Sequence, residues 1–182
     1  MLFRSYQDVW LNGKLIEKGE RDCENRYNLI KKWIEKNLEP KFTVMDIGSN
    51  MAYFPIRLIE DFNCNAIAFE FHQYDKRIKI IKKQKTKNLM YVNRKISLND
   101  LKLMSNFFKV DLIIATSVLH HVKEPVNEWI DAMKSISKYS IIELAGSDTD
   151  RAKNKVHNIN YEIIGYGDSH LDNNYKRPIY II

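Results

Sequence analysis

The stretch that decides the expected fold is Phe42-Thr43-Val44-Met45-Asp46-Ile47-Gly48-Ser49-Asn50-Met51-Ala52-Tyr53-Phe54. Its first half is an apolar, β-branched run that predicts a strand over 42–48, and its second half opens a helical pattern over about 52–62. Gly48, at the junction, permits close approach between the backbone and a ligand. A ligand there meets free N–H groups and the positive end of the helix. We therefore expect a binding site at the carboxyl end of this strand.

Short β-rich runs and helical patterns alternate outward from this stretch. The expected elements are a helix at about 20–37, a strand at 65–70, a basic helix at 75–87, a strand at 89–93, a helix at 101–108, a strand at 110–115, a helix at 126–136 and a strand at 139–144. This alternation predicts an α/β fold with a mostly parallel sheet and helices on both faces. Residues 1–18 are expected to be irregular, with a turn at Asn12-Gly13. The strands at 161–166 and 178–182 are joined by a short segment without a helical pattern, so we expect them to pair antiparallel.

Length and composition favour a soluble globular protein. The chain has 182 residues, of which 45% are hydrophobic and 29% are charged. No apolar run approaches the roughly 20 residues of a membrane helix, and the N-terminus lacks the layout of a signal peptide. A cytoplasmic location is therefore expected. The two cysteines, Cys23 and Cys64, form no CxxC pair, and no metal site is predicted.

The net charge of +6 permits nucleic-acid binding. Much of the excess lies in residues 75–87, which lack the interleaved aromatic residues of a single-strand binding surface. The favoured interpretation of this stretch is a solvated helix face.

Glu70 ends the second expected strand, about twenty residues after the glycine turn. A carboxylate at this spacing accepts hydrogen bonds from ribose hydroxyls in dinucleotide sites, because one carboxylate offers several acceptor positions. Neither the glycine turn nor the glutamate is specific alone. Together they predict a nucleoside-binding site.

Three motifs resemble those of the class I S-adenosylmethionine (SAM)-dependent methyltransferases. They are Asp46-Ile47-Gly48, then Glu70, and then the run from Asp111 through Thr116 to Leu119-His120-His121-Val122. The last ending is common among the small-molecule members of that family. The resemblance covers roughly residues 40–182 and implies a three-layer Rossmann-like methyltransferase fold with a C-terminal antiparallel hairpin. It implies a lid segment and helix at 1–40 and a SAM-binding domain at 41–182.

The resemblance also implies which residues hold SAM, whose product is S-adenosylhomocysteine. Asp46 and the loop from Gly48 to Tyr53 would border the methionine moiety and the ribose, and Glu70 would hold the ribose hydroxyls. The remaining cofactor residues would be Arg26 at the carboxylate, Phe71 beside the adenine, Ile96 and Ser97 at the adenine edge, and Ala115 and Thr116 at the methionine end. Within the loop the implied contacts are Gly48, Ser49, Asn50 and Tyr53. For Arg26 an exposed helix face with ordinary ion pairs is the alternative.

One departure from the family concerns the loop, where Asn50 and Ala52 replace glycines. Asparagine tolerates the left-handed backbone region, and alanine is small. We expect the loop to form, with a non-binding site as the alternative.

A NAD-dependent dehydrogenase is the competing interpretation of a strand–glycine–helix–glutamate arrangement. Its loop prefers Gly-x-Gly-x-x-Gly, which seats a pyrophosphate on the helix end. Here Gly48 is the only glycine in the loop, and Asp46 suits a cationic cofactor better than phosphates. SAM is therefore preferred over NAD.

His120, His121 and Glu143 are the candidate general bases, because each is expected near the reaction centre. A histidine has a pKa near neutrality. The alternatives are that the histidines pack against the following turn and that Glu143 pairs with an arginine or lysine. The expected acceptor is a small molecule, such as a hydroxyl of a sugar or of a phosphate-bearing metabolite. RNA methylation and a catalytically silent SAM-binding protein stay open, and Tyr6 and Trp10 are candidates for the acceptor pocket.

Overall fold

The computed structural model describes residues 5–72, 75–144, 159–169 and 176–182, and the side chains of 75–77 lie outside this description. The helices are α1 (Cys23–Asn37), α2 (Tyr53–Phe62), α3 (Asp75–Ile81), α4 (Leu98–Met104) and α5 (Val126–Ile136). The strands are β1 (Val9–Leu11), β2 (Lys14–Glu17), β3 (Thr43–Ile47), β4 (Asn65–Glu70), β5 (Leu89–Asn93), β6 (Val110–Thr116), β7 (Ser137–Glu143), β8 (Glu162–Asp168) and β9 (Lys176–Ile181).

The main sheet has seven strands in the order β5-β4-β3-β6-β7-β9-β8. The first five are parallel, as the alternation of strands and helices predicts. β9 pairs antiparallel with both β7 and β8, which confirms the expected C-terminal hairpin. The expected α/β fold class is therefore confirmed.

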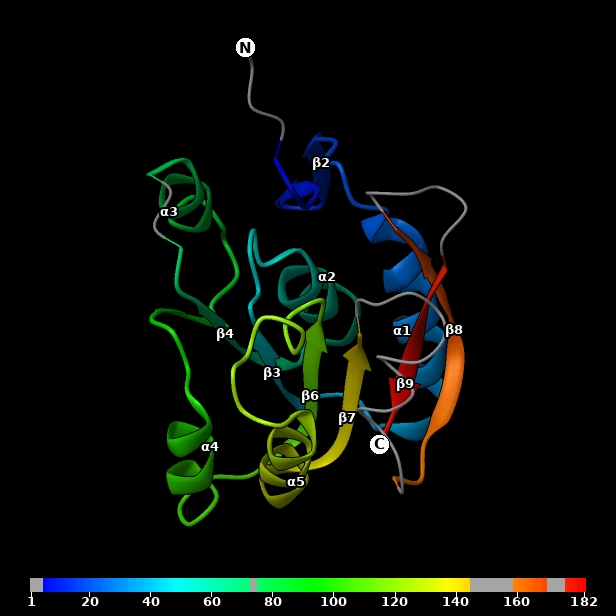
Figure 1. Cartoon of the computed structure of the whole chain (residues 1–182). Coiled ribbons are helices and arrows are strands. Elements are labelled where there is room, and N and C mark those ends of the chain that lie inside the picture. The colour runs from blue at the N-terminus through cyan, green and yellow to red at the C-terminus, as the bar shows by residue number, and fades with distance from the viewer. Residues whose placement is uncertain (1–4, 73–74, 145–158, 170–175) are drawn as a thin grey trace.

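Helices cover both faces of this sheet because neighbouring residues of each strand point to opposite sides (Figure 1). In β3, Val44 packs into a cluster with α1 and α2, represented by Tyr27 and Phe54. Met45 packs into a second cluster with α4 and α5, represented by Leu101 and Ile130. The chain thus forms three layers, and α1 shares a hydrophobic cluster with the sheet.

The N-terminal segment differs from the expected irregular chain, because β1 and β2 form an antiparallel hairpin around Asn12-Gly13. Glu60 of α2 holds this hairpin: one carboxylate oxygen accepts from the Trp10 indole N–H at 2.6 Å, and the other accepts from the Gly13 N–H at 2.8 Å. In Figure 1 the hairpin lies beyond the carboxyl ends of β6 and β7. The expectation was wrong because three- and four-residue strands carry too little alternating pattern to detect.

The basic helix is shorter than expected, and the segment between β8 and β9 is only partly described by the structure. The basic helix ends at Ile81 rather than continuing to 87. The segment expected to be non-helical between β8 and β9 lies partly outside the described residues. Among the described residues, no helix is long and apolar enough to cross a membrane.

Candidate active site

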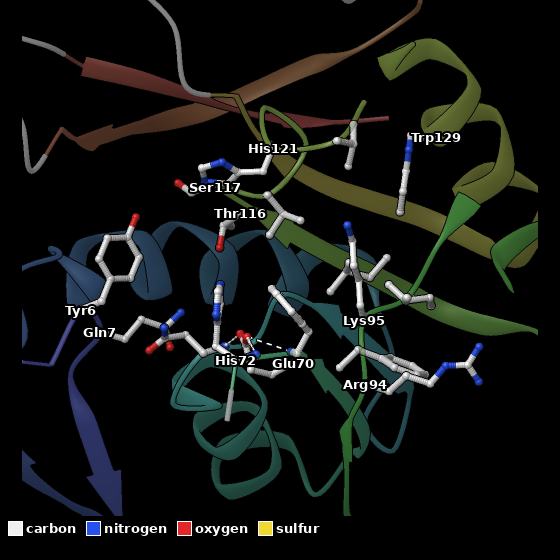
Figure 2. Close-up of a pocket in the computed structure, with 18 residues that line it drawn as sticks. Tyr6, Gln7, Glu70, His72, Arg94, Lys95, Thr116, Ser117, His121 and Trp129 are labelled. Atoms are coloured by element: carbon white, nitrogen blue, oxygen red, sulfur yellow. Dashed lines mark hydrogen bonds between the residues drawn. The ribbon is translucent and has the colours of Figure 1, made fainter. Parts of the chain in front are cut away.

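A cavity of about 410 Å³ opens at the carboxyl edge of β3, β4 and β6, where ligands bind in open α/β sheets. Figure 2 shows its lining side chains, which come from the N-terminal segment, the ends of these strands and the loops after them, the segment after β5, and α5. Seven predicted site residues line it: Gly48, Asn50, Glu70, Phe71, Ile96, Thr116 and His121.

The loop between β3 and α2 forms the cavity floor with an unusual backbone. Gly48, Asn50 and Ala52 have φ values of +74°, +48° and +56°, so all three lie in the left-handed region. A Cβ at Gly48 would lie 2.3 Å from Val118 Cγ2. Glycine is therefore favoured at this position for two reasons: a side chain would clash with Val118, and the backbone is left-handed. The loop therefore keeps the left-handed conformation although two glycines of the family pattern are absent.

Glu70 ties this loop to the end of β4. Its carboxylate is buried and accepts hydrogen bonds from the backbone N–H groups of Asn50, Phe71 and His72, each at 2.8 Å. Charge-assisted bonds of this kind are stronger than neutral ones. Glu70 thus fixes the loop and lines the cavity with the same side chain.

Asp46 lies buried beneath the loop, only 1% exposed, and does not itself line the cavity. Its Oδ2 has no hydrogen-bond partner, and neither does the Oγ of the buried Ser49. Burial first, and the nearby Glu70 charge second, raise the pKa of Asp46 well above its usual value. An orphaned carboxyl group at this place is suited to a cationic ligand, which would favour its ionised form.

Glu143 occupies the end of β7 and is fully buried. Arg21 Nη2 donates to both of its oxygens, at 3.0 and 2.9 Å. Arg26 donates from Nε at 3.1 Å and from Nη2 at 3.0 Å. Despite the burial that opposes it, bonding to Arg26 and the charges of the surrounding arginines keep the pKa of Glu143 low.

This network changes the interpretation of two predicted residues. Arg26 points its guanidinium at Glu143 and at backbone carbonyl oxygens, rather than into the main cavity. Glu143 is the partner of two arginines and lies outside the cavity lining, which favours the alternative of a structural ion pair over a general base.

The two adjacent histidines take different positions. His121 is exposed and lines the cavity. His120 is partly buried, its Nδ1 has no hydrogen-bond partner, and its ring centroid lies 3.9 Å from that of His121. Burial, followed by the neighbouring His121, lowers the pKa of His120 to about 4. His120 is therefore neutral near pH 7 and a weaker base than an ordinary histidine.

The remaining predicted residues lie behind the cavity surface. The hydroxyl group of Tyr53 donates to Glu24 at 2.6 Å, Ser97 caps α4 in a capping box with Asp100, and Ala115 is buried in β6. Trp10 packs on Arg57, with the guanidinium 4.1 Å from its ring centroid, so it lies outside the pocket.

Several cavity residues were not among the predicted cofactor or catalytic residues: Gln7, His72, Arg94, Lys95, Ser117 and Trp129. Ser117 directly follows the predicted Thr116, and its φ of +57° is a backbone feature that the sequence does not reveal. Tyr6, a candidate for the acceptor pocket, lines the cavity. Among the described residues, no group of three or more histidine, cysteine or acidic side chains is placed to hold a metal ion.

Sequence comparison finds no matching family model and no matching curated protein. Structure comparison shows that the chain has the fold of the class I SAM-dependent methyltransferases. The bifunctional kinase–methyltransferase WbdD superposes with a TM-score of 0.71 and 20% sequence identity, over 91% of this chain and 40% of WbdD. The chain thus spans about two fifths of the WbdD chain that it matches.

Two further structures are similar over almost their whole length. A precorrin-6y C5,15-methyltransferase from Geobacter metallireducens has a TM-score of 0.60 and 18% identity, over 95% of this chain and 92% of that one. A SAM-dependent methyltransferase from Aquifex aeolicus has a TM-score of 0.58 and 16% identity, over 88% and 93%. Identity at this level establishes the shared fold, so the activity has to be argued from the site.

Proposed function

We propose that the chain transfers a methyl group from SAM to a small-molecule acceptor, at a hydroxyl of a sugar or of a phosphate-bearing metabolite. The observation that carries the proposal is one continuous cavity that has Glu70 and the Gly48 loop on one side and Ser117 and His121 on another. A nucleoside site and a set of polar groups therefore open into the same space (Figure 2).

The residues present fit SAM in three respects. Glu70 offers the carboxylate for ribose hydroxyls, and exposed Phe71 beside it offers a face for adenine. Gly48 lines the cavity without a side chain, so its backbone is open to the ligand. The orphaned carboxyl group of Asp46 suits a cationic cofactor better than the phosphates of NAD.

Bound SAM supplies a methyl group that is already activated by the positive sulfur. The protein then has to align the acceptor and exclude water. Tyr6, Thr116 and Ser117 provide hydroxyl groups along the cavity wall for orientation. For a hydroxyl acceptor, His121 at the cavity wall takes the proton, because His120 lies behind the wall and its pKa is lowered to about 4, which makes it a weaker base.

Thermal unfolding with SAM, S-adenosylhomocysteine and NAD tests the cofactor. A ligand that binds only the folded state raises the unfolding temperature. We expect shifts with both adenosyl ligands but not with NAD, and their loss in Glu70→Gln, which keeps the size of the side chain. Glu39→Gln, an exposed site after α1, is the matched control. A shift with NAD alone, or no loss in Glu70→Gln, would refute the assignment.

RNA is the second acceptor to test, because the basic stretch around α3 and β5 includes the exposed Lys82, Lys83 and Lys85. Methylation of RNA, but not of small hydroxyl compounds, in an acceptor screen would overturn the small-molecule part of the proposal.

A further inference from the structure

Beside the cavity, cationic side chains outnumber anionic ones in a buried cluster. Arg21, Arg26 and Arg177 are 4%, 1% and 5% exposed, and Glu143 is the carboxylate between them. Arg21 and Arg26 both form ion pairs with Glu143. Arg177 has no ion pair among the described residues. Since an unpaired buried charge is costly, this arginine calls for an explanation.

The hydrogen bonds of Arg177 are few and long. Nη1 donates to Ser117 Oγ at 3.3 Å, Nη2 donates to Ser169 Oγ at 3.4 Å, and the buried Nε has no partner. A guanidinium group carries five N–H donors in a planar fork that matches carboxylate or phosphate oxygens. Burial, followed by the like charge of Arg21, lowers the pKa of Arg177, and the opposing charge of Glu143, which already pairs with two arginines, does not offset them.

The position of Arg177 connects it to the cavity. It lies near the start of β9, where that strand runs antiparallel to β7 and so begins at the carboxyl edge of the sheet. Ser117, which accepts from Arg177, lines the main cavity. Tyr6 lines it too, and its hydroxyl accepts from Arg21 Nη1 at 2.6 Å.

Figure 2 shows Ser117 and His121 on the side of the cavity toward β8 and β9, Tyr6 at its edge beside Gln7, and Glu70 and Arg94 on the side away from those strands. Glu70 is the group assigned to the nucleoside. The side of the cavity next to Arg177 is therefore available to the acceptor or to the methionine end of the cofactor, which the family resemblance assigns to the neighbouring Thr116.

We infer that Arg177, with Ser117 and Tyr6, binds an oxyanion of the acceptor, and this inference rests on the proposed function. The acceptor is then a small molecule that carries a phosphate or carboxylate group. An oxyanion there supplies the missing counterion and the partner that Nε lacks, and it replaces two long bonds to serine hydroxyls. The cofactor's own carboxylate has the same chemistry, so the test must separate the two sources.

The test uses the whole chain and two adenosine ligands. S-Adenosylhomocysteine has a carboxylate, whereas 5′-methylthioadenosine keeps the adenosine and thioether without the amino acid. Calorimetry gives the affinity of both for the wild type, Arg177→Gln and the exposed charge control Lys134→Gln on α5. Inorganic phosphate is then titrated into each protein, with and without 5′-methylthioadenosine or S-adenosylhomocysteine bound.

We expect Arg177→Gln to weaken phosphate binding about tenfold or more in the S-adenosylhomocysteine-loaded protein, while both adenosine ligands bind as in the wild type. Lys134→Gln should change neither. A loss of S-adenosylhomocysteine affinity with unchanged 5′-methylthioadenosine affinity would mean that Arg177 holds the cofactor carboxylate, which overturns the inference. Equal phosphate binding in Arg177→Gln and wild type would also overturn it.

Failure of the proposed function gives a different result. If neither adenosine ligand binds the wild type, the methyltransferase proposal fails. The phosphate titration of the ligand-free protein then still decides whether Arg177 binds an oxyanion.

Discussion

At the scale of single residues, buried charges without partners mark this site. Asp46 has a raised pKa because it is buried beside Glu70. In the unfolded chain the Asp46 side chain has the ordinary aspartate pKa of about 3.9. Between that pH and the folded pKa the folded state holds the extra proton, so stability falls as the pH rises through this interval. Above the pKa of Asp46 in the folded state, the full cost of burying the ionised carboxylate lowers the free energy of unfolding.

Asp46→Asn keeps the shape of the side chain and removes this penalty. We expect a higher unfolding temperature for the ligand-free protein above the folded pKa, no gain below about pH 4, and roughly tenfold weaker SAM binding. Thermal unfolding across pH and calorimetry measure these effects. Asp111→Asn is the matched control, because Asp111 accepts from the Thr43 N–H at 2.8 Å and should lose stability. Destabilisation of both variants alike would contradict the argument.

Substitutions of Arg26 and Arg177 are expected to have contrasting effects on stability. Arg26→Met breaks two bonds to Glu143 and should cost about 3 kcal/mol in the free energy of unfolding, since removing one partner of a buried ion pair is strongly destabilising. Arg177→Met removes a cation that has no counterion and should leave the stability unchanged or higher. Urea denaturation of the two variants measures the difference, and similar losses would contradict it.

The sequence predicts that Arg26 lies on a helix, but it does not predict the residue with which Arg26 pairs. Helical spacing says which face a residue occupies, whereas the pairing with Glu143, 117 positions later, depends on how α1 docks on the sheet. Cofactor residues that line the cavity, such as Gly48 and Glu70, were predictable because each stands at the end of a recognisable strand.

At the scale of elements, the parallel strands were predictable and the short pieces were not. The strands at 65–70 and 89–93 have the expected bounds, because apolar runs bounded by polar residues specify them locally. The β1–β2 hairpin is held instead by hydrogen bonds to Glu60 of α2, and no local sequence pattern predicts these long-range contacts.

The loop after β3 gives a prediction at this scale because it packs on the loop after β6. Gly48→Ala puts a methyl group 2.3 Å from Val118 Cγ2 and strains a φ of +74°, which costs about 1–3 kcal/mol for the φ alone. We expect lower stability and at least tenfold weaker S-adenosylhomocysteine binding, about the loss of 1.4 kcal/mol.

Val118→Ala in the Gly48→Ala background removes the clash but leaves the backbone strain. A double-mutant cycle should therefore show favourable coupling, with binding partly restored. Additive losses would mean that the two loops do not contact each other in solution.

At the scale of the whole molecule, charge separates the two acceptor classes. The net charge of +6 includes exposed lysines around α3 and β5, whereas Arg177 is buried beside the cavity. Salt screens exposed charges far more than buried ones. RNA that contacts 6–10 phosphates would lose roughly 10³–10⁵-fold in affinity between 50 and 200 mM salt.

An anionic small acceptor held at Arg177 should respond differently, because one buried contact releases few counterions. We expect phosphate affinity for the S-adenosylhomocysteine-loaded protein to fall by no more than about tenfold over the same range. Calorimetry in both salt concentrations measures it, with an RNA oligonucleotide titrated in parallel. A phosphate affinity that falls as steeply as that of RNA would place the anion on the exposed lysines, where the net charge, and not the buried arginine, attracts it.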